Sequence, residues 1–183
     1  MTLREISLHI LDLMENSVRA GASVISVSIT EDSKRNCLEI SIEDDGPGMG
    51  VSFDAVTNPF YTTKKGERTG LGLSLFRAAA EQAGGNIAIR RSPLGGIEVH
   101  AIMDIDHVDR APLGDIAGTL SGVLCTNPDI DIRFNYRVDG REFSLRSPDI
   151  AGDIPPDKRT GIVLSRIALL KMKNGLARID ITA

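Results

Sequence analysis

A stripe of polar side chains near the start of the chain has the chemistry to hold a charged ligand. If residues 3–20 form a helix, Glu5, His9, Asp12, Asn16 and Arg19 share one narrow face. The amide oxygen of Asn16 suits Mg²⁺, and Asp12, one turn earlier, could orient a water. Taken alone, the stripe is more typical of a solvated helix face, because most surface helices are amphipathic.

A second group is the segment Asp44–Gly48, read Asp-Asp-Gly-Pro-Gly, which follows an apolar strand pattern. Glycine lets the backbone pass close to a flat ligand. A carboxylate at the end of a strand can accept a hydrogen bond from an exocyclic amine such as that of adenine. A plain surface turn explains the same residues, because Asp-Gly and Pro-Gly are common turn pairs.

A third group, Thr69–Leu73, reads Thr-Gly-Leu-Gly-Leu and leads into an apolar helical pattern. Free N–H groups and the helix dipole make such a helix start a phosphate site. Glycines that serve packing alone are the alternative. The segment is no Walker A loop, because Gly-Lys-Ser/Thr is missing. No strand precedes it, as the dinucleotide-binding fingerprint would require.

The elements that must position these groups follow from apolar periodicity. We expect helices over residues 3–20, 51–58 and 71–83, a mobile loop over 59–69, and strands over 24–29, 37–42, 86–90 and 97–103. Paired strands without helical crossovers predict an α+β two-layer sandwich.

A change in composition near residue 104 predicts a boundary between a domain at 1–104 and a smaller α+β extension at 105–183. In the extension we expect a helix over 116–124, a hairpin of residues 130–138 and 141–145 around Asp139-Gly140, a helix over 157–173 ended by Asn174-Gly175, and a last strand over 176–181. The hairpin and the final helix offer a docking surface for a protein partner.

Composition excludes several other classes of protein. The net charge is −4, and basic residues form only short pairs such as Lys64-Lys65, which argues against nucleic-acid binding. The two cysteines, Cys37 and Cys125, are too far apart in sequence for a zinc motif and suit a reducing compartment. Neither a signal peptide nor a membrane span is visible, so we expect a cytoplasmic protein.

In their order and spacing, the three groups resemble motifs of the ATP-binding domain shared by gyrase, Hsp90, histidine kinases and MutL (GHKL). Asp12–Ala22 is similar to the N box, closest to its MutL form, and Asp44–Gly48 to the first glycine box. Asn58–Lys64 is similar to the F box of histidine kinases, and Thr69–Leu75 to the second glycine box. The resemblance covers roughly residues 3–103.

The resemblance implies a role for each matching position, in the sandwich known as the Bergerat fold. Asn16 would bind Mg²⁺, Asp44 the adenine amine, and residues 59–69 would be a short ATP lid. The implied ATP-binding residues are Asn16, Asp44, Gly46, Gly48, Met49, Phe60, Thr63, Lys64, Arg68, Thr69, Gly70, Leu71, Gly72 and Leu73. The cofactors are therefore ATP and Mg²⁺.

Three departures from the family pattern bear on catalysis and affinity. Members that hydrolyse ATP use Glu as general base at the position of Asp12. Because a shift of about 1 Å can cost about 10²-fold in rate, hydrolysis is expected to be slow or absent. Arg68 replaces the first glycine of the second glycine box, and Ile97 stands where relatives often carry Thr.

Two functions remain open. The helix of the N box starts near residue 3, so we expect no preceding dimerisation domain with a phosphoacceptor histidine and no conventional autophosphorylation. The chain would then be an ATPase or a kinase acting on a partner, as the stand-alone anti-sigma serine kinases are, or a regulatory subunit gated by ATP. The whole-chain layout is similar to small bacterial ATP-binding proteins associated with iron hydrogenase systems, which suggests a redox partner. A homodimer is a further prediction.

Overall fold

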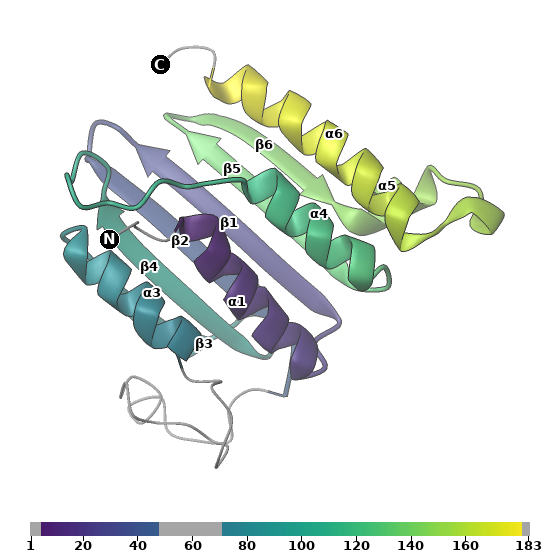
Figure 1. Ribbon diagram of the computed structural model, residues 1–183, viewed down its shortest axis with the longest axis horizontal. Coiled ribbons are helices and arrows are strands. Elements are labelled where there is room, and N and C mark those ends of the chain that lie inside the picture. The colour runs from purple at the N-terminus through teal and green to yellow at the C-terminus, as the bar shows by residue number, and fades with distance from the viewer. Residues whose placement is uncertain (1–4, 48–70, 181–183) are drawn as a thin grey trace.

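One six-stranded sheet runs through the described part of the chain, residues 5–47 and 71–180 of 183, in the computed structural model (Figure 1). The N-terminal elements are α1 (Ile6–Arg19), β1 (Val24–Asp32), β2 (Cys37–Asp44), α3 (Leu71–Gln82), β3 (Asn86–Arg91) and β4 (Ile97–Asp104). They are followed by α4 (Ile116–Thr126), β5 (Asp131–Val138), β6 (Arg141–Arg146), α5 (Ser147–Gly152), a 3₁₀ turn (Pro156–Lys158) and α6 (Gly161–Asp180). The strand order is β3-β4-β2-β1-β5-β6.

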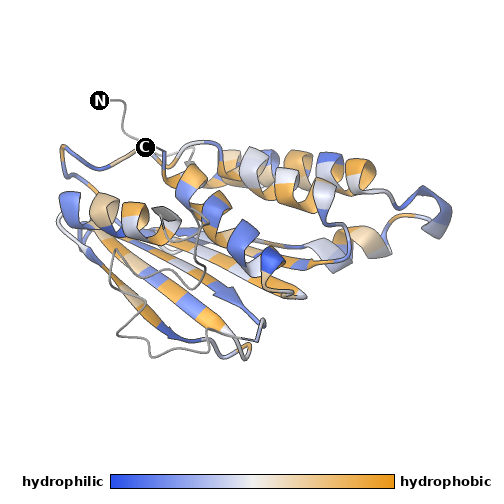
Figure 2. Cartoon of the chain, turned by 60° about the horizontal axis from the view of Figure 1, so that its bottom comes forward, coloured by the Kyte–Doolittle hydropathy of each residue, from blue (hydrophilic) through white to orange (hydrophobic). Residues whose placement is uncertain are grey.

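The sheet has one buried and one open face. Along β1 and β2 the buried side chains alternate with half-buried ones, as a period of two requires. Figure 2 shows this alternation as orange and blue bands along the strands. The helices lie on the buried face, so the predicted α+β two-layer sandwich is confirmed. Its core contains Ile25, Val27 and Ile29 of β1 with Leu38, Ile40 and Ile42 of β2.

Helix α1 crosses the middle of the sheet, and its first residues are bonded to the segment before α4. Its first N–H groups, on Ile6 and Ser7, donate to the carbonyls of Pro112 and Leu113 at 2.9 and 2.8 Å. These bonds satisfy donors that a helix start otherwise leaves unpaired. The helix ends before Gly21, whose φ of +84° is the left-handed conformation common just after a helix.

The segment after residue 104 continues the same sheet. Strand β5 pairs in parallel with β1, with Val27 opposite Phe134, and β6 pairs antiparallel with β5. The predicted β5–β6 hairpin is confirmed, with φ values of +47° at Asp139 and +84° at Gly140. The division into two domains at 104 remains a prediction, but the strands on both sides of it form one sheet.

The end of the chain differs from the prediction. The expected helix over 157–173 and strand over 176–181 are replaced by one helix, α6, which continues to Asp180. Met172, Leu176 and Ile179 continue the helical spacing of apolar side chains beyond Gly175. Gly175 is a packing residue, since a Cβ there would lie 2.2 Å from the Phe143 ring. Helix α5 was not predicted.

Some expectations fall outside the described residues, namely the helix over 51–58 and the loop over 59–69. Within residues 5–47 and 71–180, we find no helix with both the length and the apolar character that crossing a bilayer requires.

Candidate functional site

Asp44, the last residue of β2, carries a buried carboxylate held from three sides. Ser17 of α1 donates its hydroxyl to Oδ2 at 2.6 Å. The N–H groups of Gly46 and Ile97 donate to Oδ1 at 3.0 and 3.2 Å. Asp44 is only 9% exposed, so these donors replace the water that an ionised carboxylate needs. The arrangement fixes the direction in which the carboxylate can accept a further bond.

Glycines let the backbone close around Asp44. A Cβ on Gly96 would lie 2.1 Å from Asp44 Oδ1 and 2.6 Å from the Asp44 carbonyl oxygen, so this position excludes a side chain. The Gly96 N–H donates to that carbonyl at 3.1 Å. Gly46 is less tightly enclosed, with Oδ1 at 3.3 Å from its hypothetical Cβ. Gly96 was not among the predicted site residues.

The neighbouring carboxylate, Asp45, is held by hydrogen bonds from the residues at the start of β1. Its Oδ1 accepts from the N–H groups of Ser23 and Val24, each at 2.8 Å, and its Oδ2 accepts from Ser23 Oγ at 2.5 Å. Burial acts to raise the pKa of the Asp45 carboxyl, but these hydrogen bonds outweigh it and hold the pKa below its usual value. Asp45 therefore ties the turn after β2 to the start of β1.

The polar residues of α1 lie beside the start of α3. A Cβ on Gly72 would lie 3.2 Å from Asp12 Cβ, so the glycine brings the two helices together at this point. Asp12 and Asn16 are both half-buried. Asn16 Oδ1 accepts from Arg19 Nη2 at 2.5 Å, so the predicted metal ligand has a cationic neighbour.

His9, in the same predicted stripe, is a core residue. Its ring is 3% exposed and stacks on Phe76 of α3 with centroids 5.3 Å apart. The packing of α1 on α3 thus encloses the His9 ring. The stripe thus divides into a buried histidine, two half-buried residues and the exposed Glu5 and Arg19.

Most of the predicted ATP-binding residues lie outside the part of the chain that the structure describes. Gly48, Met49, Phe60, Thr63, Lys64, Arg68, Thr69 and Gly70 lie outside the described residues. Leu71 is the first residue of α3, and Leu73 packs against the core. The structure therefore brings together Asp12, Asn16, Asp44, Gly46 and Gly72, while the roles assigned to them stay predictions.

Ser17 also supports the site and was missed from the sequence, whereas Ile97 was noted there only as a departure from the family pattern. Ser17 was overlooked because a serine beside Asn16 is unremarkable in a polar helix. Its bond to Asp44 spans 27 residues of chain, and no local pattern reports such a contact. Ile97 contributes through its backbone N–H, which every residue except proline possesses, so its type carries no signal.

A bound Mg²⁺ would have few protein ligands here. Within the described ranges no group of three or more His, Cys, Asp or Glu side chains could hold a metal ion. This arrangement fits Mg²⁺, which nucleotide sites often bind through one or two protein groups, with water and phosphate completing its shell. Asn16 offers one such group.

Over residues 3–107, more than half of the chain, the sequence matches the family described as histidine kinase-, DNA gyrase B- and HSP90-like ATPase. The sensor histidine kinase ZraS of Escherichia coli K12 is 35% identical over 81 residues, which are 44% of this chain and 17% of that protein. TmoS of Ectopseudomonas mendocina, also a sensor histidine kinase, is 32% identical over 94 residues, covering 48% and 10% respectively. The chain thus spans less than a fifth of the length of either. Neither relative supports the predicted link to hydrogenase systems.

Two solved structures complete the comparison. The ATP-binding domain of PrrB from Mycobacterium tuberculosis is 26% identical, with a TM-score of 0.41, covering 53% of this chain and 64% of that one. The ATPase domain of Aquifex aeolicus MutL, complexed with ADP, is 15% identical, with a TM-score of 0.43 and coverage of 80% and 64%. On the extent of the family match, this chain belongs to the histidine kinase-, DNA gyrase B- and HSP90-like ATPases.

Proposed function

We propose that this chain binds Mg-ATP beside Asp44 and uses it as an ATPase or as a kinase that phosphorylates a protein partner. The observation that carries the proposal is the buried Asp44 carboxylate, held by Ser17 and by the N–H groups of Gly46 and Ile97. A carboxylate so fully supplied with fixed donors is an oriented acceptor, which is what recognition of an adenine amine needs.

The hydrogen bonds of Asp44 leave room for one more donor. Each carboxylate oxygen can accept about two hydrogen bonds. Within residues 5–47 and 71–180, Oδ1 accepts two, from Gly46 and Ile97, whereas Oδ2 accepts one, from Ser17. The open position on Oδ2 would take the exocyclic amine of adenine. A purine with a carbonyl oxygen in place of that amine would put an acceptor opposite the acceptor Asp44 Oδ2, so it would bind more weakly.

The phosphates would extend toward α3 and the polar face of α1. Asn16 would hold Mg²⁺, which when bound neutralises phosphate charge, and N–H groups at the start of α3 would bind phosphate oxygens. Arg19, exposed and bonded to Asn16, adds a positive charge at the same place. The predicted lid, residues 59–69, would complete the site.

Asp12 is the residue expected to activate a water or an acceptor hydroxyl. It lies against Gly72, near the start of α3. An aspartate reaches one methylene less far than glutamate, so we expect slow hydrolysis. Transfer to a partner that brings its own well-placed hydroxyl or imidazole would be less affected.

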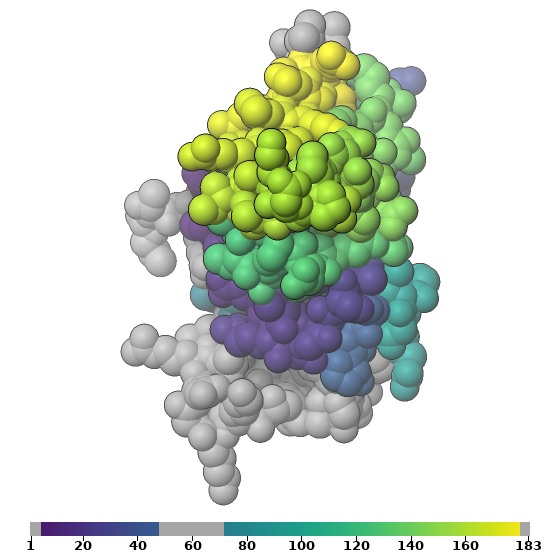
Figure 3. Space-filling model, turned by 90° about the vertical axis from the view of Figure 1, so that its right-hand side faces the viewer, coloured from purple at the N-terminus to yellow at the C-terminus, as the bar shows by residue number. Residues whose placement is uncertain are grey.

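A second candidate function, a module that ATP switches without hydrolysis, is favoured by the attachment of α1. This helix carries Asp12, Asn16 and Ser17, and its first N–H groups bond to the segment before α4. Helix α4 also packs on α1 and on α6. Figure 3 shows the end of α1 in purple, α4 in green and the chain from α5 to the start of α6 in yellow-green next to one another. A ligand that moves α1 would therefore also shift α4 and α6.

Titration calorimetry with ATP, GTP and ITP, each with Mg²⁺, tests the binding site. We expect ATP to bind about 10- to 100-fold more tightly than ITP, the effect of about 1.4–2.8 kcal/mol for one mispaired buried acceptor. Equal binding of the three nucleotides, or binding of none, would contradict the proposal.

Activity is measured separately with γ-labelled ATP, alone and with proteins that co-purify with the chain. Release of phosphate or transfer of label supports the enzyme function. The Asp12→Asn variant should then lack whichever of these two activities the wild type has. ATP binding that changes the affinity for a co-purifying protein, with no release or transfer, supports the switch.

A further inference from the structure

We propose that the groove between β6 and α6 binds an extended acidic segment of a protein partner as an added strand of the sheet. Strand β6 is one edge of the sheet, and among the described residues β5 is its only neighbouring strand. An edge strand presents unpaired N–H and C=O groups that another chain can use. A groove of about 630 Å³ runs between this strand and the last helix.

The floor of the groove is apolar. Phe143 and Leu145 from β6 and Ile150 from α5 meet Ile179 from α6 along it. Gly175 allows α6 to approach, since a Cβ there would overlap the Phe143 ring. Because side chains of an extended chain alternate between its two faces, every second side chain of an added strand would face this floor.

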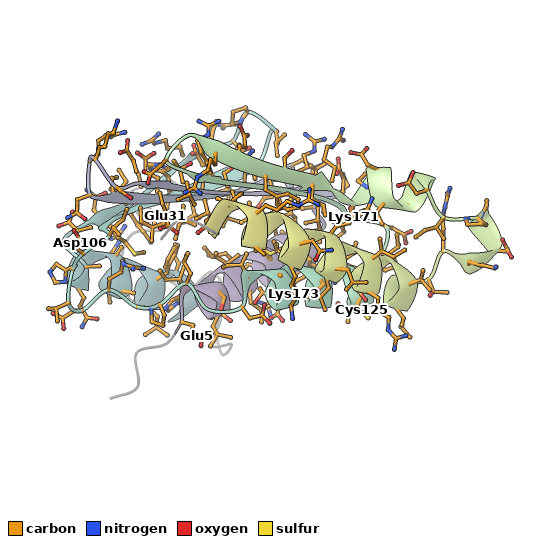
Figure 4. The ribbon with its side chains drawn as sticks, turned by 90° about the horizontal axis from the view of Figure 1, so that it is seen from above. Glu5, Glu31, Asp106, Cys125, Lys171 and Lys173 are labelled. Atoms are coloured by element: carbon orange, nitrogen blue, oxygen red, sulfur yellow. The ribbon has the colours of Figure 1, made fainter. Side chains whose placement is uncertain are left out.

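The rim of the groove is mainly basic. Its cations are Arg141, Arg146, Lys171 and Arg178, against two acids, Glu142 and Asp149. The groove thus has a net charge of +2, taken as four cations less two acids, in a chain whose net charge is −4. Figure 4 views the molecule from this side and labels Lys171 on α6. Charge complementarity therefore favours an acidic occupant.

Arg146 and Lys171 form ion pairs with acids of the chain, and the Lys171 pair is exposed on both sides. Arg146 lies 3.0 Å from Asp131, and Lys171 lies 3.4 Å from Asp153. The Arg146 side chain is 50% exposed and that of Lys171 is 49% exposed. The Asp153 side chain is 74% exposed, whereas that of Asp131 is only 16% exposed. Ion pairs exposed on both sides contribute about 0–1 kcal/mol, so an incoming carboxylate can replace Asp153 beside Lys171 at little cost.

A second copy of the chain is a poor occupant. Pairing β6 with another β6 would bring two basic rims together, and like charges facing each other across strands are destabilising. Charges on edge strands commonly prevent this kind of self-association. The same cations that repel a copy attract an acidic segment.

The inference rests on the proposed use of a protein partner but is tested without nucleotide. The probe is a fluorescein-labelled ten-residue peptide of alternating Glu and Val. Its controls are the Lys-Val peptide and a Glu-Val peptide N-methylated on every residue, which keeps the charge and removes the N–H donors along both edges of the strand. We expect the first peptide to bind, each control to bind at least about tenfold more weakly, and amide hydrogen exchange to slow in β6.

Charge reversal tests whether the peptide binds in the groove. Lys171→Glu with Arg178→Glu should weaken peptide binding at least about tenfold. The matched control, Lys34→Glu with Arg35→Glu, makes the same change in net charge at exposed residues between β1 and β2 and should leave binding unchanged. Circular dichroism checks that both variants fold.

Three outcomes would overturn the inference: no peptide binding, equal binding of the N-methylated peptide, or an equal loss in the Lys34–Arg35 control. A dimer in sedimentation that only the groove variant dissociates would assign β6 to a second copy and would overturn it too. ATP binding is measured on the same variants. The groove variant should bind ATP as the wild type does, so a failure of peptide binding and a failure of ATP binding can be told apart.

Discussion

Ser17 and Asp44 join the helix of the candidate site to the end of its central strand. The Ser17 hydroxyl donates to Asp44 Oδ2 at 2.6 Å, and both side chains are buried. Ser17 Oγ also lies 3.3 Å from the carbonyl oxygen of Leu13, one turn earlier in α1. The position of α1, and with it of Asp12 and Asn16, is therefore coupled directly to the orientation of the carboxylate expected to recognise adenine.

Replacing Ser17 by Ala should lower the free energy of unfolding by about 1–3 kcal/mol, because a buried carboxylate loses a donor. ATP affinity should fall as well, since Asp44 is no longer held in one orientation. Urea denaturation and calorimetry measure the two effects. Ser28→Ala on the open sheet face is the matched control and should change stability by no more than about 0.5 kcal/mol. Equal effects of the two substitutions would contradict the role of Ser17.

Gly96→Ala should destabilise the protein by about 1–3 kcal/mol or more and abolish ATP binding, because the new Cβ would overlap Asp44 Oδ1. Gly122→Ala is the control. Gly122 lies in α4 with nothing within 4 Å of its hypothetical Cβ, so alanine there should stabilise by about 0.5–1 kcal/mol. Thermal or urea unfolding distinguishes the opposite signs, and a neutral Gly96→Ala would show that the turn relaxes.

Gly175→Ala tests the contact between α6 and β6. In an unobstructed helix this substitution stabilises by about 1 kcal/mol, whereas here the Cβ would lie 2.2 Å from the Phe143 ring. We expect destabilisation of about 1–3 kcal/mol. A double-mutant cycle with Phe143→Leu should recover much of the loss, because the smaller side chain leaves space for the methyl group. Additive losses in the cycle would place the cause elsewhere.

Asp45 should make stability depend on acid pH. The pKa of its carboxyl is held below the usual value of 3.8: burial opposes the shift, and hydrogen bonds from Ser23 and Val24 outweigh it. A depressed pKa in the folded state stabilises above the unfolded pKa, and this contribution is lost as pH falls through the folded value. The difference in unfolding free energy between wild type and Asp45→Asn should therefore be constant from about pH 5 upward and shrink below about pH 4.

Ser23→Ala provides the partner experiment for Asp45, since it removes the hydroxyl that donates to Asp45 Oδ2. In the Ser23→Ala background, the pH-dependent difference in unfolding free energy caused by Asp45→Asn should be smaller. Denaturation curves recorded between about pH 2 and pH 7 measure both variants. A difference that grows on acidification would show that the folded pKa is raised, contrary to the geometry.

Arg19→Ala should increase the benefit that Mg²⁺ brings to nucleotide binding. Arg19 Nη2 lies 2.5 Å from Asn16 Oδ1, the oxygen proposed to bind the metal, so the two cations compete for it. The measured quantity is the affinity for ATP with Mg²⁺ divided by that with EDTA, which cancels the general attraction of Arg19 for phosphate. We expect this ratio to rise about 3- to 10-fold, equivalent to the net strength of one hydrogen bond.

Asn16→Ala is the matched variant for the metal experiment. It removes the amide oxygen itself, so the same ratio should fall toward one. If Arg19→Ala leaves the ratio unchanged while Asn16→Ala lowers it, the guanidinium does not compete with the metal. An unchanged ratio in both variants would remove Asn16 from the metal site.

Most elements were predictable because their signals are local. The strands that became β1 to β6 have alternating or continuous apolar patterns, and the Asp139-Gly140 turn needs residues that tolerate positive φ. The last helix was predicted wrongly for a physical reason that is not local. Gly175 has the composition of a helix end, but its role depends on Phe143, 32 positions earlier in the chain by their numbers, which occupies the space a side chain would need.

The sequence alone predicted the kind of ligand, because four ordered motifs that resemble those of the family supply an amide, a carboxylate and glycine-rich turns that suit Mg-ATP. It also determined the two-layer arrangement, since the apolar periods permit one buried face on each element. The resemblance assigned the adenine contact to Asp44, but only the tertiary structure shows how the hydrogen bonds of the two adjacent aspartates differ. Asp44 and Asp45 are chemically identical, and the donors that separate their roles come from α1, β1 and β4, far along the chain. Hydrogen-bond partners at such separations depend on how the elements pack, which residue types alone do not specify.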